Sequence, residues 1–382
     1  MKTPLLIFSS QDWDDLPTRK HRFAKAFAAN GNPVLFVEAP FTYLSRFADK
    51  SYNLKLKKSG QIEKVRDNLW VASPPPVMPF YGRYRFMQNQ ACKKLSKFVN
   101  KVRTEIGFPT EFISLFYLPW MNPILKSINP KVAVYDCVDD HTGYGGTQCV
   151  KFLDRVEGEL AKSCNAVFAT AKYLTDNLKK HNNKAIYLPN AVDENLFKKT
   201  LESDAVRDIK KPRVVYAGAL RWWFDSELLF SISKALPEVS FIIIGGERGS
   251  ELGKNGTNLR SLPNVHFLGR RPQEQLPSLM SGSSCGIIPF KQVELTKSVS
   301  PLKLYEYASI GLPTVSVPMS ELESFPDSVV TKANTAEEFI EAIKRITSSE
   351  PDQKAISEFV SENTWSNRTQ RFSQELLSLW EK

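Results

Sequence analysis

The sequence SPLKLYEYASIGLPTV, residues 300–315, combines the start of a helix, its end and a buried strand in one short stretch. Pro301 suits the first helical turn, where a backbone N–H has no partner, and Gly311 followed by Pro313 ends the helix. The apolar residues that follow favour a strand. We therefore expect a helix over 302–310 and a strand over 314–317.

Two charged side chains of this stretch, Lys303 and Glu306, are three residues apart and project from one face of the first turn. A cation there suits phosphate, a carboxylate suits sugar hydroxyls, and a helix N-terminus favours anions. A nucleoside-diphosphate sugar presents all of these groups. Lys–Glu pairs at this spacing are also common on solvated helix faces, but here the flanking residues are apolar or aromatic.

Further motifs follow one another along the C-terminal half of the chain. They are Tyr216-Ala217-Gly218-Ala219, Trp223-Phe224-Asp225, Pro263-Asn264-Val265, Phe267-Leu268-Gly269 and Ile288-Pro289-Phe290. Together with residues 300–315 they resemble the donor-site signature of GT-B glycosyltransferases of the bacterial polysaccharide group. The resemblance implies that Ser300, Pro301, Leu302, Lys303 and Glu306 bind the nucleotide sugar.

The fold class that we expect is α/β, because strand and helix signals alternate through most of the chain. The resemblance implies the GT-B architecture: two Rossmann-like domains facing a cleft, with a C-terminal helix that crosses back to the first domain. We place the acceptor-binding domain at residues 1–195 and a polar linker at 196–211. The donor domain then covers 212–364, and the final helix covers 365–382.

More donor-site residues are expected where strands of the second domain end. Gly218 and Gly246 permit close approach of the backbone to phosphate, and Arg221 can neutralise a diphosphate. Asp225 belongs to the same loop, although it also suits the N-cap of the next helix.

One feature departs from the family pattern. Many retaining GT-B enzymes carry a second glutamate eight residues before the ribose-binding one. That position is Ser298 here, and Glu294 lies out of register. The resemblance therefore does not imply retention of the anomeric configuration.

The chemical step in an inverting enzyme needs a base for the acceptor hydroxyl. Asp139 is the first candidate, in a Tyr-Asp-x-x-Asp pattern after a predicted strand, and His21 is the second. Asp12-Trp13-Asp14 has the Asp-x-Asp form that holds Mn²⁺ in GT-A enzymes, but it directly follows the first strand. We therefore expect no metal requirement and no cofactor, with Lys303 and Arg221 supplying the positive charge.

The net charge of +10 is concentrated in residues 51–103, which hold 12 basic and 2 acidic side chains. Basic residues interleaved with aromatic ones favour an anionic surface, although a merely solvated basic face has the same composition. The candidates for an acceptor or membrane surface are Arg83, Arg85, Lys93, Lys94 and Lys97. No nucleic-acid module is recognisable.

These observations predict a bacterial-type, hexosyltransferase-class enzyme that uses a nucleoside-diphosphate sugar. The acceptor would be a lipid-linked glycan or a polysaccharide in surface-glycan synthesis, as for lipopolysaccharide. We expect a monomer or weak dimer in the cytoplasm, peripheral on the inner face of the plasma membrane. Two alternatives remain: a non-hydrolysing nucleotide-sugar epimerase, and a non-catalytic subunit that binds a nucleotide sugar or glycan.

Overall fold

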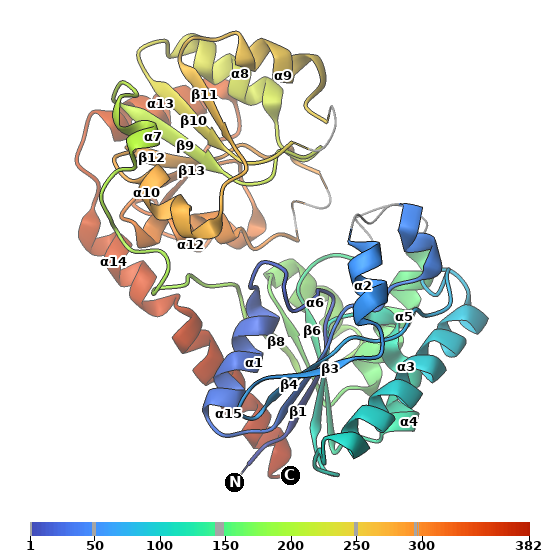
Figure 1. Ribbon diagram of the computed structural model, residues 1–382. Coiled ribbons are helices and arrows are strands. Elements are labelled where there is room, and N and C mark those ends of the chain that lie inside the picture. Colours follow the sequence, from blue (N-terminus) through green and yellow to red (C-terminus); the bar gives the residue numbers. More distant parts are fainter. Residues whose placement is uncertain (1, 48–50, 142–148, 248–250, 294–295, 297) are drawn as a thin grey trace. The chain divides into compact units, whose positions relative to one another are not determined.

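The computed structural model describes residues 2–47, 51–141, 149–247, 251–293, 296 and 298–382. The chain forms two compact units, one of Met1–Pro189 with Thr369–Lys382 and the other of Asn190–Arg368. Each unit is an open α/β sheet with helices on both faces (Figure 1). The α/β fold class is therefore confirmed.

The N-terminal unit is built on an eight-stranded sheet in the order β3-β4-β2-β1-β5-β6-β7-β8. All neighbours pair in parallel except β3 and β4, which form an antiparallel hairpin. The strands are β1 (Leu5–Phe8), β2 (Val34–Val37), β3 (Ile62–Arg66), β4 (Leu69–Ala72), β5 (Ile113–Phe116), β6 (Val132–Cys137), β7 (Ala166–Ala169) and β8 (Ala185–Tyr187). The central strands are apolar and buried on both faces, as parallel strands between two helical layers must be.

Helices cover this sheet by turning apolar stripes toward it. In α3 (Arg85–Glu105) the buried residues recur at helical spacing, among them Cys92, Leu95 and Val99. The other helices are α1 (Arg19–Ala29), α2 (Tyr52–Lys58), α4 (Leu125–Ile128), α5 (Val150–Ser163) and α6 (Lys172–Lys179), with 3₁₀ turns η1 (Tyr43–Phe47) and η2 (Pro119–Ile124). No helix among the described residues is long and apolar enough to cross a membrane.

The C-terminal unit has a six-stranded, all-parallel sheet in the order β11-β10-β9-β12-β13-β14. Its strands are β9 (Arg213–Ala217), β10 (Ser240–Ile244), β11 (Val265–Gly269), β12 (Cys285–Ile288), β13 (Thr314–Ser316) and β14 (Val330–Lys332). Its helices are α7 (Asp204–Arg207), α8 (Ser226–Ala235), α9 (Gly253–Arg260), α10 (Leu276–Met280), α12 (Leu302–Ser309), α13 (Ala336–Thr347) and α14 (Gln353–Glu362), with 3₁₀ turns η3 (Gln273–Gln275) and η4 (Ser320–Leu322). Residues 190–211, predicted to end the first domain and form a linker, cluster with this unit.

The last helix, α15 (Trp365–Trp380), contributes its final part to the N-terminal unit. Phe372 stacks on Phe23 of α1 with ring centroids 4.2 Å apart, and it meets Phe168 of β7 edge-on at 4.8 Å. The predicted return of the C-terminal helix to the first domain is confirmed by these contacts.

Each sheet has one point where the strand order reverses direction. In the N-terminal unit the chain winds outward from β1 through β2 and then returns to the other side of β1 with β5. In the C-terminal unit the same reversal falls between β9 and β12. Ligands of open α/β sheets bind beyond the carboxyl ends of the strands at such points, so these two edges are where a site is expected.

Candidate functional site

The first turn of α12 carries the charged pair that the sequence singled out. Lys303 Nζ lies 2.6 Å from Glu306 Oε2; Glu306 is buried and Lys303 is partly exposed. Pro301 is the N-cap residue in an extended conformation, as expected for a helix start. The cation and the carboxylate therefore neutralise each other and share one face of the helix.

A buried tyrosine fixes α12 on the sheet. The Ala217 amide, at the end of β9, donates a hydrogen bond of 2.8 Å to the Tyr307 hydroxyl. A Cβ at Gly286 of β12 would lie 2.2 Å from the Tyr307 ring, so this ring fits only over a glycine. Sequence reasoning missed this contact, although a glycine inside a strand is a signal of close approach. Tyr307 thereby positions Lys303 and Glu306 beside the end of β9.

The turns after β9 and β10 pack tightly through glycines. A Cβ at Gly245 would lie 1.8 Å from the carbonyl oxygen of Gly218, so the two backbones touch. A Cβ on Gly218 itself would lie 2.7 Å from the Tyr216 hydroxyl. At Gly246 an added Cβ would make only an ordinary contact with Arg270, at 3.5 Å. The fold therefore demands Gly245 and Gly218, whereas none of the described residues of this unit demands a glycine at 246.

The loop between β9 and α8 carries Arg221 and Asp225. Arg221 Nε is 2.8 Å from Glu251 Oε2, and the guanidinium lies 5.5 Å from the Trp223 ring centroid. The Asp225 carboxylate accepts a 2.9 Å hydrogen bond from the Leu228 amide and so caps α8. The alternative interpretation of Asp225 as an N-cap therefore describes its contacts in the structure.

Residues just before α12 complete this edge. Ser300 is buried and its carbonyl accepts a hydrogen bond of 3.1 Å from the Asn190 side chain. Leu302 is 38% exposed at the first turn, an apolar side chain open to a ligand. Ser298 is buried, and Glu294 lies outside the described residues.

At the matching edge of the N-terminal unit a buried ion pair joins distant parts of the chain. Arg19 Nε of α1 lies 2.8 Å from Asp136 Oδ2 of β6, with both side chains almost fully buried. Arg19 also donates to the Leu188 carbonyl at 2.8 Å. Arg19 and Lys20 are both buried, although they stand at the start of a helix.

Lys20 lies beside the reversal point between β1 and β5. Its Nζ donates to Ser10 Oγ and Gln11 Oε1, each at 3.0 Å, and lies 5.0 Å from the Tyr117 ring centroid. Burial lowers the pKa of Lys20 to about 8, and the nearby carboxylates of Asp139 and Asp136 oppose that shift. The predicted base Asp139 is half-buried and interacts electrostatically with this amine.

His21 uses both ring nitrogens within its own loop. Nδ1 accepts a hydrogen bond of 3.1 Å from the Thr18 amide. Nε2 therefore carries the proton and donates a hydrogen bond of 3.0 Å to the Asp12 carbonyl. The ring is buried against Trp13 and Phe36, and this burial lowers its pKa. Such a ring has no lone pair to accept a substrate proton. The interpretation of His21 as a base is therefore corrected: it fixes the loop before α1.

Two further titratable groups lie near the end of β6. Burial raises the pKa of Glu157 to about 7, and the Tyr135 hydroxyl donates to its carboxylate at 2.5 Å. Burial lowers the pKa of His141 to about 4, so its imidazole is neutral near pH 7. Neither residue was singled out from the sequence, because nothing local marks a side chain that becomes buried by tertiary packing.

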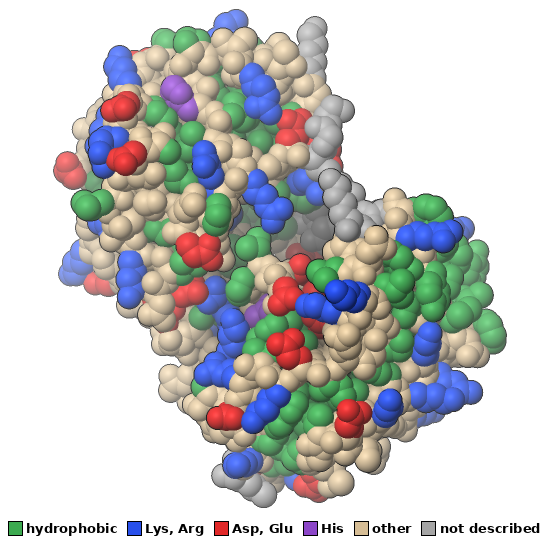
Figure 2. Space-filling view, in the orientation of Figure 1, with side chains coloured by type: hydrophobic (Ala, Val, Ile, Leu, Met, Phe, Trp, Pro, Cys, Tyr) green, Lys and Arg blue, Asp and Glu red, His purple; other side chains and the backbone are tan. Residues whose placement is uncertain are grey.

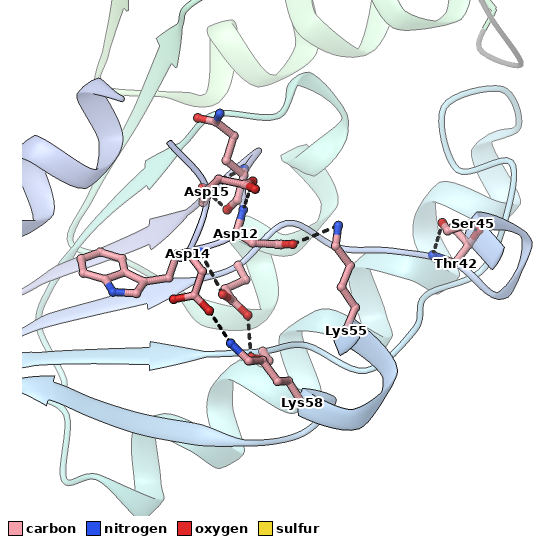
Figure 3. Close-up of polar contacts among 12 residues, drawn as sticks. Asp12, Asp14, Asp15, Thr42, Ser45, Lys55 and Lys58 are labelled. Carbon is pink, nitrogen blue, oxygen red and sulfur yellow. Dashed lines mark hydrogen bonds and ion pairs between the residues drawn. The ribbon is translucent and has the colours of Figure 1, made fainter. Parts of the chain in front are cut away.

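The loop after β1 and helix α2 border a cavity of about 190 Å³ that is lined by both charged and apolar side chains (Figure 3). Asp12 pairs with Lys55 at 3.0 Å and Asp14 with Lys58 at 2.5 Å. Glu38, which follows β2, accepts hydrogen bonds from the Trp13 amide at 2.9 Å and from the Ser73 hydroxyl at 2.5 Å. Both carboxylates of the Asp-x-Asp motif are thus engaged by lysines. Among the described residues, no group of three or more His, Cys, Asp or Glu is placed to hold a metal ion.

The basic side chains predicted to face an acceptor or membrane lie at the start and along one side of α3. Arg83, Lys93, Lys94 and Lys97 are exposed. Arg85 is instead half-buried and pairs with Glu159 of α5.

The C-terminal unit matches the family model "Glycosyl transferases group 1" over residues 211–349. The chain is 24% identical over 335 residues to the Bacillus subtilis (strain 168) protein TuaH, whose name assigns it to teichuronic acid biosynthesis as a glycosyltransferase. That match covers 81% of this chain and 79% of TuaH.

Solved structures of the same fold cover nearly the whole chain. Sucrose-phosphate synthase from Thermosynechococcus elongatus has a TM-score of 0.76 at 14% identity, with 100% of both chains covered. HepE of Anabaena, solved with UDP and glucose, has a TM-score of 0.68 at 15% identity, covering 99% of this chain and 100% of that one. An α,α-trehalose-phosphate synthase (UDP-forming) from Burkholderia vietnamiensis has a TM-score of 0.70 at 11% identity, covering 100% and 99%.

The fold and the family match together define the class of protein. Two parallel-sheet Rossmann-like units, a charged pair on the helix beside β12 and a group 1 match over the second unit are features of GT-B glycosyltransferases. The second unit therefore matches a glycosyl transferases group 1 domain, on a chain that has the GT-B fold and resembles TuaH over most of its length.

Proposed function

We propose that this enzyme transfers a hexose from a uridine-diphosphate sugar to a growing surface glycan. The observation that carries the proposal is the Lys303–Glu306 pair at the strand reversal of the C-terminal unit. UDP is the proposed nucleotide because HepE was solved with it and the trehalose-phosphate synthase is described as UDP-forming. The name of TuaH supports a cell-surface polysaccharide as the product.

Binding of the donor would break the ion pair between Lys303 and Glu306 on α12. The diphosphate takes the place of Glu306 as the partner of Lys303. The released Glu306 carboxylate then accepts hydrogen bonds from the ribose hydroxyls. Arg221 adds a second positive charge, oriented by Glu251. Gly246 lets the backbone approach the phosphates, and Ser300 and Leu302 border the nucleotide. Because Lys303 and Arg221 stabilise the leaving diphosphate, no metal ion or cofactor is required in this proposal.

The acceptor would bind on the N-terminal unit, where Asp139 removes the proton of its attacking hydroxyl in an inverting reaction. The buried amine of Lys20 interacts electrostatically with Asp139. The cavity beside Asp12 and Lys55 offers hydrogen-bond acceptors and donors to sugar hydroxyls. The exposed lysines of α3 would hold the enzyme, as a monomer or weak dimer, at the cytoplasmic face of the plasma membrane.

A UDP-release assay with UDP-glucose, UDP-N-acetylglucosamine and UDP-glucuronate, supplied with a bacterial glycolipid extract, tests this proposal. We expect one donor to be turned over and Lys303→Ala to weaken its binding by about tenfold to a hundredfold, the loss of a charge-assisted hydrogen bond. Asp139→Asn should reduce turnover by about a hundredfold or more while donor binding stays intact. An Asp139→Asn variant as active as the wild type would remove Asp139 as the base. Binding of UDP-sugars without turnover would instead identify a non-catalytic binding subunit.

A further inference from the structure

Exposed apolar side chains are concentrated in one part of the N-terminal unit. Nine of the sixteen large apolar side chains that are exposed among the described residues fall between positions 43 and 86. They are Tyr43, Leu44, Phe47, Leu54, Leu56, Met78, Phe80, Tyr84 and Phe86. Figure 2 shows hydrophobic side chains gathered where η1 and α2 lie in Figure 1. A concentration of this kind marks an interaction surface.

Helix α2 is inverted relative to an ordinary surface helix. It has no buried residue, and its inward contacts include the ion pairs of Lys55 and Lys58 with Asp12 and Asp14 (Figure 3) and an edge-on contact of Tyr52 with Phe41. Leu54 and Leu56 are 55% and 42% exposed. In a surface helix of a globular protein the apolar side faces the core and the charges face water. The exposed leucines of α2 therefore indicate an interaction surface.

The segment after β4 joins η1 in the same surface. Val77 pairs with Thr42, and its amide donates to the Phe41 carbonyl at 2.8 Å, so residues 77–80 run beside the start of η1. Phe80 is 43% exposed although its φ is +58°, a left-handed conformation that bulky residues rarely adopt. Backbone strain of this kind accumulates at functional positions.

The basic side chains near this surface indicate the kind of partner that it binds. Arg46 of η1, Lys57 of α2 and Arg83 are exposed basic side chains among these apolar residues, whereas Lys55 and Lys58 pair with Asp12 and Asp14. Apolar residues interleaved with lysine and arginine fit the interface of a bilayer that contains anionic lipid. A second copy of this chain would bring the same positive charge against it, which disfavours self-association through this face.

We propose that η1, α2 and residues 78–86 insert into the interface of an anionic phospholipid bilayer and thereby select a lipid-linked acceptor. Leu54 belongs to this surface and also lines the cavity beside Asp12. The cavity would therefore lie next to the bilayer surface when the protein is bound. A glycan attached to lipid reaches it directly, whereas a free polysaccharide does not. The choice of acceptor rests on the proposed glycosyl transfer; the membrane contact does not.

Vesicle sedimentation of the full chain tests the inference. The probes are vesicles of phosphatidylethanolamine with about 30% phosphatidylglycerol, and vesicles of phosphatidylcholine alone. We expect the wild type to bind the anionic vesicles, and Leu54→Ser/Leu56→Ser to lower its partition coefficient by about tenfold. Leu201→Ser is the matched control, because Leu201 is 87% exposed but lies in the other unit. Phe47→Ser/Phe86→Ser, on η1 and α3, should repeat the loss.

Three outcomes would overturn the inference. In the first, the wild type does not bind anionic vesicles. In the second, the leucine variants bind these vesicles as strongly as the wild type. In the third, the wild type is a dimer without lipid and the leucine variants are monomers. UDP binding measured on the same samples separates this test from the proposed function. Absence of UDP binding by the wild type would contradict the proposed donor. The vesicle measurement would still test the membrane contact independently.

Discussion

The two units place their charged groups at equivalent edges of similar sheets, but they assemble them differently. In the C-terminal unit Lys303 and Glu306 are three residues apart on one helix. In the N-terminal unit Arg19 and Asp136 are separated by 117 positions and meet in the interior. The first pair forms as soon as its helix forms, whereas the second exists only when the whole sheet is folded. The charged pair of the C-terminal unit is thus formed locally, whereas that of the N-terminal unit requires the folded state.

The largest effect that sharpens this comparison is on the stability of the N-terminal unit. Arg19→Ala leaves Asp136 buried without its partner, so the free energy of unfolding should fall by about 3–5 kcal/mol. Lys179→Ala is the matched control, because it breaks an exposed pair with Asp176 worth less than about 1 kcal/mol. Urea unfolding followed by tryptophan fluorescence measures both. Equal effects of the two variants would show that the buried pair does not organise this unit.

A second effect concerns pH and Glu157. Burial raises the pKa of Glu157 from 4.5 to about 7, so the folded state binds the proton more tightly than the unfolded state. This stabilisation is complete below pH 4.5 and is lost as the pH rises through about 7, a difference of roughly 3 kcal/mol. Glu157→Gln should remove that part of the pH dependence. Stability curves at several pH values that coincide for wild type and variant would contradict the assignment.

A pair of glycine variants separates folding from donor binding in the C-terminal unit. Gly245→Ala drives a Cβ against the Gly218 carbonyl and should destabilise the unit by about 1–3 kcal/mol. Gly246→Ala meets only Arg270 at an ordinary distance, so it should leave stability unchanged and weaken UDP binding. Thermal unfolding with and without UDP distinguishes the two. Unchanged UDP affinity of Gly246→Ala would remove Gly246 from the donor site.

The smallest effect concerns Asp225, for which two roles were considered. As the N-cap of α8 it should contribute about 1 kcal/mol, lost in Asp225→Ala and largely kept in Asp225→Ser. Chemical denaturation reports the cap, and calorimetry with UDP reports any donor contact. If Asp225→Ser keeps stability but loses UDP affinity, Asp225 also binds the donor.

The sequence was sufficient where structure is decided locally. Strand β13, helix α12 and the start of α15 were predicted within a residue or two, because an apolar run, Pro301 and Gly311 mark the first two of them. The Lys303–Glu306 pair was predictable for the same reason. His21 was misjudged because its hydrogen bonds with Thr18 and Asp12 form only when the loop after β1 packs on α1. The burial of Arg19 was not predicted because its partner Asp136 comes from a strand far along the chain. No local pattern distinguishes an arginine on a helix surface from one buried against a distant aspartate.

The central claim is that the first turn of α12 binds the diphosphate of a sugar donor. Thermal unfolding of the wild type and of Lys303→Ala, with UDP, GDP, TDP, ADP and CMP in turn, tests it most directly. A diphosphate at about one hundred times its Kd should stabilise the wild type by about 2.7 kcal/mol. The account predicts that UDP produces this shift and that Lys303→Ala loses most of it. A UDP shift that is equally large in Lys303→Ala would contradict the assignment of this helix as the donor site.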